Sequence, residues 1–363
     1  MKLNCGFVGL PNVGKSTLFN ALSNSSVAAE NYPFCTIEPN VGIIEIPDER
    51  LKVLSEVFAP KKTTYNTIEF IDIAGLVKNA HQGEGLGNQF LSQIRSVKVI
   101  VQVIRFFEDK NITHVENKVN PLNDMGTINT ELVLADIKTL EKSLEKNEKL
   151  IKARKPESKP TKTILNNLLE HLNKGLFART FQRNSKEDVI INNLFLLTDK
   201  PMVCVANTDE NSVLTNQIQE AETLAKQNSS SFIIINGKLE SQMTDLNEEE
   251  KQLMLNEYGL KEAGLNSLIK KSYEILGLQT FFTCNKEEVK ARTIARGASA
   301  VQAAGEVHTD FAKKFIKAEI STFNNVIKHK NNIKSLKTLG LVKIVGKDYI
   351  MQEGDIAYFI KGQ

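Results

Sequence analysis

The chain has 363 residues, of which 41% are hydrophobic and 25% charged, and a net charge of +3 at neutral pH. This composition is typical of a globular protein long enough for two or three domains, and the sequence holds no apolar run near the roughly 20 residues that a membrane-spanning helix needs. We therefore expect a cytoplasmic protein without a membrane anchor. The start of the chain enters a strand-like run at once, which leaves no room for a signal peptide.

Four cysteines lie far apart, with no C-x-x-C pair: Cys5, Cys35, Cys204 and Cys284. This spacing predicts neither a zinc site nor a disulfide framework. Cys5 and Cys204 fall in apolar runs, where we expect packed side chains. Cys35 falls in a polar loop and is expected to be an inert thiol, with oxidation sensitivity as the alternative.

The first predicted elements are a buried strand at 3–8 and a helix that begins near residue 17, and the segment between them fits G-x-x-x-x-G-K-[ST]. Gly9 and Gly14 allow the backbone N–H groups to converge on one anion at the start of a helix. We predict a phosphate-binding loop. The residues expected to bind nucleotide here are Asn12, Val13, Gly14, Lys15, Ser16 and Thr17.

Three side chains of this loop have separate predicted tasks. Lys15 reaches the outer phosphates, and Ser16 offers a hydroxyl oxygen to a phosphate-bound Mg²⁺. Asn12 is a candidate ligand for a monovalent cation such as K⁺, whose charge would help to neutralise the phosphates.

Two further segments complete a predicted nucleotide switch. Asp72 and Gly75 fit D-x-x-G at the end of a strand at 67–73, with the carboxylate near Mg²⁺ and the glycine N–H near the γ-phosphate. Upstream, Thr36 lies in a polar, turn-rich segment and is a second candidate ligand for Mg²⁺, with a plain surface residue as the alternative.

Leu76 occupies the position where many switch proteins carry a glutamine that orients water. Leucine cannot bind water, so we expect slow hydrolysis. The glycine-rich segment that follows contains His81, which is a candidate catalytic residue when this segment orders; a solvent-facing histidine is the alternative.

After a strand at 97–104, residues 126–199 predict a helical insertion. Apolar residues spaced by threes and fours predict a helix over 136–152, a turn between Pro156 and Pro160, and a second helix that includes 164–172. The simplest arrangement is an antiparallel hairpin, with a charged face that either meets a partner or serves a purely structural arm.

Strands at 201–206 and 232–235 then resume the first pattern, and each is followed by a candidate base-binding loop. The first, 207–210, departs from the guanine motif N-K-x-D in its second and last residues; the predicted base contacts in it are Asn207, Thr208 and Glu210. The second loop contributes Asn236 and Gly237, whose backbone N–H groups would close over the base. A displaced carboxylate leaves guanine donors unpaired, so the pattern favours adenine.

Residues 278–363 alternate short β-like runs with turns and predict a small α+β domain. The resulting division is a nucleotide domain at 1–125 and 200–277, a helical insertion at 126–199 and a C-terminal domain at 278–363. The insertion and the C-terminal domain are basic, at +3 and +6, whereas the remainder is acidic at −6. This contrast favours contact with a polyanion such as RNA, with a solvated surface as the alternative.

These motifs together resemble the YchF family of Obg-like ATPases over nearly the whole chain. The most specific segments are 9–17, 31–39, 72–88 and 303–311. The resemblance implies an α/β P-loop domain with a mixed, mainly parallel sheet, interrupted by a coiled-coil hairpin and followed by a ubiquitin-like TGS domain. It also implies ATP preferred over GTP, slow Mg²⁺-dependent hydrolysis often assisted by K⁺, and association with the ribosome.

The ribosomal contact would be rRNA or a ribosomal protein, with tRNA as a further candidate, and we expect a monomer. Members of the family often have Ser-Ala where this chain has Asn236-Gly237, which leaves the fit around the base less defined than the fit around the phosphates. Two alternatives stand beside this hypothesis. One is a GTP-dependent switch of the same architecture, and the other is an RNA-binding scaffold in which the nucleotide is a structural ligand.

Overall fold

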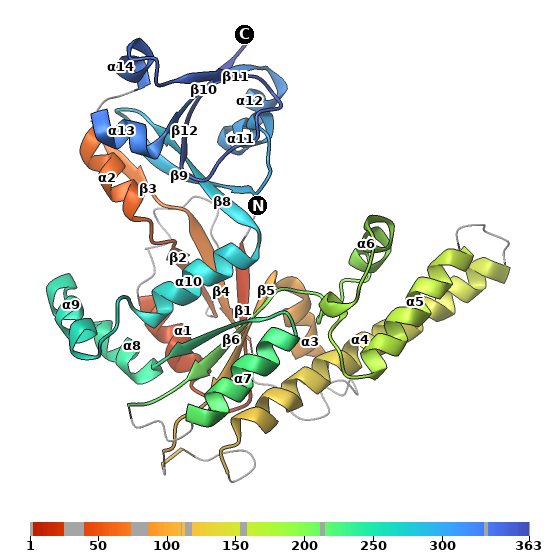
Figure 1. Ribbon diagram of the computed structural model, residues 1–363. Coiled ribbons are helices and arrows are strands. Elements are labelled where there is room, and N and C mark those ends of the chain that lie inside the picture. Colours follow the sequence, from red (N-terminus) through yellow and green to blue (C-terminus); the bar gives the residue numbers. More distant parts are fainter. Residues whose placement is uncertain are drawn as a thin grey trace. The chain divides into compact units, whose positions relative to one another are not determined.

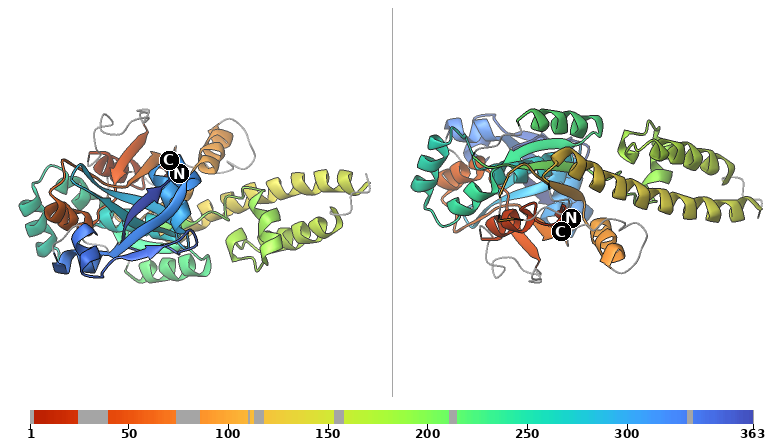
Figure 2. Two further views of the ribbon diagram at one scale, coloured as in Figure 1. Left: turned by 90° about the horizontal axis from the view of Figure 1, so that it is seen from above. Right: turned by 90° about the horizontal axis from the view of Figure 1, so that it is seen from below.

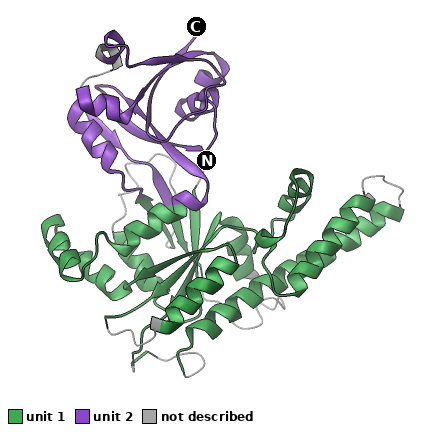
Figure 3. Cartoon of the chain, in the orientation of Figure 1, with its two compact units in different colours: residues 1–44, 69–272 green, residues 45–68, 273–363 purple. Residues whose placement is uncertain are grey.

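The structure is a computed structural model that describes residues 3–24, 40–73, 86–109, 111–112, 118–152, 158–210, 215–329 and 333–362. The chain divides into two compact units, coloured separately in Figure 3: residues 1–44 with 69–272, and residues 45–68 with 273–363. We call them unit 1 and unit 2. The segment 45–68, which the sequence-based division assigned to the nucleotide domain, packs with the C-terminal residues instead.

Unit 1 is an α/β unit around one sheet (Figure 1). The described strands of this sheet follow the order β2-β4-β1-β5-β6-β7. The elements are β1 (Asn4–Val8), α1 (Lys15–Asn24), β2 (Val41–Glu45), β4 (Thr67–Asp72), α3 (Leu86–Ser96), β5 (Val99–Arg105), α4 (Pro121–Lys152), α5 (Ser158–Asn173), the 3₁₀ turn η3 (Ala178–Thr180), α6 (Ser185–Asn192), β6 (Met202–Asn207), α7 (Thr215–Gln227), β7 (Ser231–Ile235), α8 (Gly237–Met243), α9 (Glu248–Glu257) and α10 (Gly264–Ile275).

The centre of this sheet is parallel. β1 pairs with both β4 and β5, and β5, β6 and β7 follow in register. Every residue of β5 and β6 is buried, as expected for strands covered on both faces. At the edge of the sheet, β2 is antiparallel to β4. Backbone hydrogen bonds from the Asp72 N–H to the Asn40 carbonyl and from the Ile46 N–H to the Asn66 carbonyl show this direction. The predicted mixed, mainly parallel sheet is confirmed.

A helical hairpin interrupts unit 1 between β5 and β6. α4 and α5 run side by side away from the sheet (Figure 2), with Leu140 of α4 and Leu165, Leu168 and Leu172 of α5 buried. α4 begins at Pro121, earlier than the predicted 136, because its first turns already bury Met125, Ile128 and Leu132. The second helix also begins earlier than predicted: Pro160, expected to end the turn, lies in the first turn of α5, where its missing N–H costs nothing. The residues between α4 and α5 lie outside the described part of the chain.

One buried carboxylate joins the hairpin to the chain that returns to the sheet. Asp136 of α4 accepts hydrogen bonds of 2.7 Å from the backbone N–H groups of Leu197 and Thr198 and from the Thr198 hydroxyl. Burial raises the pKa of Asp136 to about 6, and the three donors act in the opposite direction. This contact fixes α4 against the residues that precede β6.

Unit 2 contains the second sheet, in the order β11-β10-β12-β8-β9-β3 among the described strands. β3 is parallel to β9 although more than two hundred residues separate them in the chain. The elements are α2 (Glu49–Phe58), β3 (Lys62–Thr64), β8 (Leu278–Cys284), β9 (Glu288–Ala295), α11 (Ala300–Val307), α12 (Thr309–Lys313), β10 (Phe315–Thr322), α13 (Phe323–His329), α14 (Ile333–Thr338), β11 (Lys343–Val345) and β12 (Asp355–Lys361).

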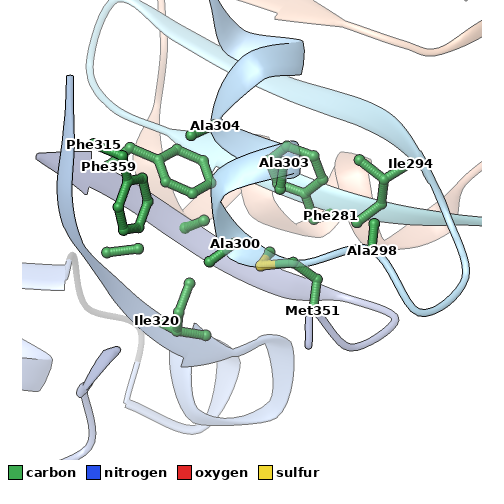
Figure 4. Close-up of a cluster of buried hydrophobic side chains, with 12 residues drawn as sticks. Phe281, Ile294, Ala298, Ala300, Ala303, Ala304, Phe315, Ile320, Met351 and Phe359 are labelled. Atoms are coloured by element: carbon green, nitrogen blue, oxygen red, sulfur yellow. The ribbon is translucent and has the colours of Figure 1, made fainter. Parts of the chain in front are cut away.

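Two clusters of buried side chains stabilise unit 2. In the first, the three alanines of α11 allow a close approach to the aromatic side chains of the sheet (Figure 4): Phe281, Phe315 and Phe359. The second joins Leu51 and Leu54 of α2 to Phe282 of β8 and Ile356 of β12. The segment 45–68 is therefore part of the hydrophobic core of unit 2.

No helix among the described residues has the length and apolar character needed to cross a bilayer. Cys5 and Cys204 are buried as expected, and burial raises the pKa of each thiol to about 12. Cys35 lies outside the described residues.

Candidate nucleotide site

The phosphate-binding loop connects the end of β1 to the start of α1. Gly14 has a φ of 88° and Asn12 a φ of 62°, a left-handed conformation that glycine adopts freely and asparagine tolerates better than most residues. The side chain of Val13 is buried, whereas those of Ser16 and Thr17 are exposed. The loop therefore has the strand, turn and helix order that the sequence predicts.

Lys15, Ser16 and Asp72 meet beneath this loop. The Lys15 ammonium forms an ion pair with Oδ1 of Asp72, and the Ser16 hydroxyl donates a hydrogen bond of 3.1 Å to Oδ2. Their closeness follows from the sheet, because β4 is parallel to β1 and Asp72 pairs with Phe7, two residues before the loop begins. The structure thus brings together the three residues that sequence analysis assigned to the phosphates and to Mg²⁺.

The oxygen donors at this position fit Mg²⁺. A serine hydroxyl and a carboxylate lie next to each other, which is the hard-oxygen chemistry that the ion prefers. Within the described ranges, no group of three or more His, Cys, Asp or Glu side chains converges to hold a metal alone.

Asn207, at the end of β6, links two loops through its buried side chain. Its Nδ2 donates a hydrogen bond of 2.9 Å to the Val13 carbonyl, and its Oδ1 accepts one of 3.0 Å from the Gly237 N–H. Sequence analysis assigned the Asn207 amide and the Gly237 N–H to the base. In the structure these two groups bond each other, so Asn207 connects the phosphate loop to the loop that contains Asn236 and Gly237.

Two glycines allow this close approach. A Cβ at Gly14 would overlap Nδ2 of Asn207, and a Cβ at Gly237 would lie 2.8 Å from its Oδ1. Leu18 of α1 would lie 3.2 Å from the same Gly237 Cβ. Close packing against Asn207 and Leu18 therefore explains why glycine stands at position 237, which the sequence did not reveal.

Arg105 was missed by sequence analysis. It ends β5 beside Asn207, is 1% exposed, and donates hydrogen bonds to four carbonyl oxygens: Asn12 at 3.4 Å, Phe107 at 3.1 Å, Asp109 at 3.4 Å and Ile112 at 3.2 Å. Its guanidinium also lies 4.5 Å from the centre of the Phe107 ring. A charged residue at the end of an otherwise buried and largely apolar strand is the signal that could have revealed it.

These loops surround a cavity of about 1050 Å³, which is large enough for a nucleotide. All of its lining residues belong to unit 1. They are Leu10, Pro11, Asn12, Gly14, Lys15, Ser16, Thr17, Phe107, Glu108, Asp109, Ile112, Asn207, Thr208, Asp209, Glu210, Asn236, Gly237, Lys238, Ser241 and Gln242.

The remaining base-side residues have varied partners. The Thr208 N–H donates to the Ile235 carbonyl at 2.9 Å, and the Asn236 side chain caps α8 by accepting from the Leu239 N–H at 3.1 Å. Glu210 accepts a hydrogen bond of 3.0 Å from the Tyr258 hydroxyl. The Glu210 carboxylate, which was predicted to contact the base, is thus bound by a tyrosine at the end of α9.

Several predicted site residues lie outside the described part of the chain. These are Thr36, Gly75, Leu76 and His81. Their roles stay predictions.

The phosphate loop, the carboxylate beneath it and the base-side loops at one edge of a parallel sheet define a P-loop nucleotide-binding protein with a helical insertion. A family model described as a 50S ribosome-binding GTPase matches residues 4–167, and a model for the C-terminal region of YchF GTPases, described as a protein of unknown function, matches residues 278–361.

Curated relatives extend the match to the full chain. A protein named ribosome-binding ATPase YchF from Bacillus subtilis is 44% identical over 363 residues, which cover 99% of both chains. One of the same name from Escherichia coli O157:H7 is 43% identical, again over 99% of both. The solved structure of the Schizosaccharomyces pombe YchF GTPase has a TM-score of 0.87 at 35% identity and covers 99% of this chain and 98% of that one. The chain belongs to the YchF family of Obg-like ATPases.

Proposed function

We propose that this protein is an ATP-binding and slowly ATP-hydrolysing switch that associates with the ribosome in the cytoplasm. The observation that carries the proposal is the convergence of Lys15 and Ser16 on Asp72 beneath the phosphate loop. Relatives of more than 40% identity are named ribosome-binding ATPases, which supports both halves of the proposal.

Each residue has a specific task in this proposal. The loop N–H groups and Lys15 hold the phosphates, while Ser16, Asp72 and Thr36 would hold Mg²⁺ directly or through water. When bound, Mg²⁺ neutralises charge that develops on the phosphate oxygens. Leu76 cannot orient water, so hydrolysis depends on Gly75, on His81 or on a K⁺ ion beside Asn12, and turnover is slow.

Adenine is the proposed base because the carboxylate of the base-side loop is Glu210, one methylene longer than the aspartate of the guanine motif. Guanine is the alternative, and it gains support from the name of the S. pombe relative, a YchF GTPase. Titration with fluorescent ATP and GTP analogues separates the two. A clear preference for GTP would overturn the proposed base.

The enzymatic half is tested by phosphate release from ATP with and without Mg²⁺ and K⁺. We expect Lys15→Ala to lower the rate about a hundredfold, because it removes a fixed positive charge from the phosphates. Lys226→Ala is the matched control, since Lys226 pairs with Glu222 on α7 and does not line the cavity. Equal rates for wild type and Lys15→Ala would show that the nucleotide is a structural ligand of a scaffold.

The ribosomal half is tested by co-sedimentation of the pure protein with ribosomes. If rRNA or tRNA phosphates provide the contact, the bound fraction falls as salt rises, because each neutralised phosphate releases counterions. Binding that does not change with salt would assign the contact to a ribosomal protein, and no binding at all would overturn this half.

A further inference from the structure

Glu210 is held from outside the nucleotide cavity by a tyrosine. The Tyr258 hydroxyl donates a hydrogen bond of 3.0 Å to Oε1 of Glu210. Glu210 lines the cavity and Tyr258 is not among its lining residues, so the phenol reaches the carboxylate from outside the cavity. The hydrogen bond to the carboxylate raises the pKa of Tyr258 further above neutral pH, where a phenol is already protonated and can donate.

Tyr258 occupies a defined position because it ends a helix that is fixed at its start and along its length. α9 begins with a capping box in which the side chains of Asn247 and Glu250 bond each other's backbone N–H groups. Leu255, three residues before Tyr258, packs with Leu239 and Met243 of α8. The backbone position of Tyr258 therefore depends on packing between two helices, while its partly exposed phenol is held by the hydrogen bond to Glu210.

The chain after Tyr258 is fixed as well. Gly259 has a φ of 65°, and the Leu260 N–H returns to the Leu255 carbonyl at 2.8 Å, which closes the end of the helix. Further on, the Gly264 N–H donates a hydrogen bond of 2.6 Å to the buried carboxylate of Glu240 in α8. α8 and α9 thus pack together as one unit, which we call the α8–α9 frame, next to the loops 207–210 and 236–237 that line the cavity.

This frame is continuous with the phosphate loop. α8 starts at Gly237, whose N–H bonds Asn207, and Asn207 bonds the Val13 carbonyl. Tyr258 is therefore linked through α8 to the contacts that hold the phosphate loop, and Glu210 is linked in the same way through its hydrogen bond to Tyr258.

The number of carboxylate oxygens that face the base decides which base fits. Guanine presents two neighbouring donors, N1–H and the 2-amino group, and needs both oxygens of one carboxylate. Adenine presents one exocyclic amino group next to an acceptor nitrogen and needs one oxygen. The hydrogen bond from Tyr258 uses one of the two lone pairs of Oε1 and restrains rotation of the carboxylate, so Oε2 is the oxygen with more capacity to accept from the base.

We propose that Tyr258 is a specificity-determining positioning residue, which holds Glu210 as a single-oxygen acceptor and so favours adenine over guanine nucleotides. The inference rests on the proposed ATP preference and explains how this chain achieves it. It assigns to α9 a role in choosing the base, although α9 itself supplies no side chain to the cavity.

The test is calorimetric titration of the full-length protein and of Tyr258→Phe with ADP, GDP, IDP and pyrophosphate, each with Mg²⁺. We expect the ratio of the GDP and ADP dissociation constants to fall about tenfold in Tyr258→Phe, the worth of one hydrogen bond to a charged group. IDP lacks the 2-amino group and should gain less than GDP. Pyrophosphate, which has no base, should bind both proteins equally.

Tyr358→Phe is the matched control, because it removes the same hydroxyl from an exposed tyrosine of β12 and should leave the ratio unchanged. An unchanged ratio in Tyr258→Phe, with normal pyrophosphate binding, would overturn the inference. So would an equal shift when Tyr258→Phe is added to Glu210→Gln, because the effect would then not act through the carboxylate. A wild-type preference for GDP would overturn the proposed ATP preference, whereas the change in ratio would still test Tyr258.

Discussion

Gly14 lies so close to the Asn207 amide that the phosphate loop accepts no side chain there. Its φ of 88° adds a second restriction, because residues with a Cβ rarely adopt that conformation. The two effects act on the same bond, from Asn207 to the Val13 carbonyl. The shape of the loop therefore depends on a residue from a strand about two hundred positions later in the chain.

Gly14→Ala should weaken ADP binding by at least about tenfold, because the methyl group displaces Asn207 and strains the loop by roughly 1 to 2 kcal/mol. Calorimetric titration measures the loss. Gly126→Ala is the control: a Cβ at Gly126 in α4 meets nothing within 4 Å, so alanine should leave binding unchanged and stabilise the helix. Normal ADP affinity in Gly14→Ala would show that the loop can form without the Asn207 contact.

The residue types of the site were predictable, but their partners were not. The motif indicated Lys15, Ser16 and Asp72 because each residue type is needed for phosphate or Mg²⁺ chemistry. Arg105 was not found, because it acts on backbone carbonyls and no motif encodes that task. The amide of Asn207 was assigned to a base, since the sequence does not show that Gly237 lies beside it.

At the level of elements, the hairpin of α4 and α5 is anchored by Asp136, a carboxylate whose ionised form is disfavoured by burial. Asp136 is fully buried, and burial raises its pKa from 3.8 to about 6. Between these two values the folded protein binds a proton at Asp136 and the unfolded chain does not. The contribution of Asp136 to the free energy of unfolding therefore decreases as pH rises from about 4 to 6 and is constant above that range.

This effect is measured by urea unfolding of wild type and Asp136→Asn at several values between about pH 4.5 and 7. Asparagine places an amide N–H against a backbone N–H of Leu197 or Thr198, so the variant should be less stable throughout. The stability gap between the two proteins should be largest at low pH and shrink by up to about 3 kcal/mol toward pH 7. A gap that does not change with pH would contradict the raised pKa.

The elements that sequence analysis located well are those with strong local patterns. The strands at 67–73, 97–104 and 201–206 are found within about two residues. Burial on both faces gives the latter two their largely apolar runs, whereas 67–73 shows an alternation of buried and partly exposed residues. β3 was missed, since three residues carry little pattern and their partner is β9 at 288–290. The early start of α4 was missed because its first turns bury apolar residues against the body of unit 1 rather than in the hairpin stripe.

For the molecule as a whole, the chain enters unit 2 twice. It does so first as residues 45–68, between the segments that hold Thr36 and Asp72, and again from residue 273 onward. Leu51 and Leu54 complete a core whose other members lie in the C-terminal part, including Phe282 and Ile356. The folding of unit 2 is therefore linked through the chain to strands that flank the nucleotide site.

Leu54→Ala should destabilise unit 2 by roughly 2 to 5 kcal/mol, because Leu54 is fully buried and its truncation leaves a cavity. Hydrogen exchange of backbone amides in β8 and β12 should accelerate accordingly. Leu253→Ala, at a leucine of α9 that is 70% exposed, is the control and should change stability by less than about 0.5 kcal/mol. Unchanged exchange in β8 and β12 would remove α2 from the core of unit 2.

The double entry into unit 2 limits how the protein can be recombined with its relatives. A chimaera that takes only residues 278–361 from another member would place foreign β8 and β12 surfaces against native Leu51 and Leu54, because α2 is encoded far upstream. A working exchange needs three junctions, one at each end of 45–68 and one before residue 273, so that both stretches come from the same parent. Substitutions in these two stretches are thus expected to be compatible only in matched pairs.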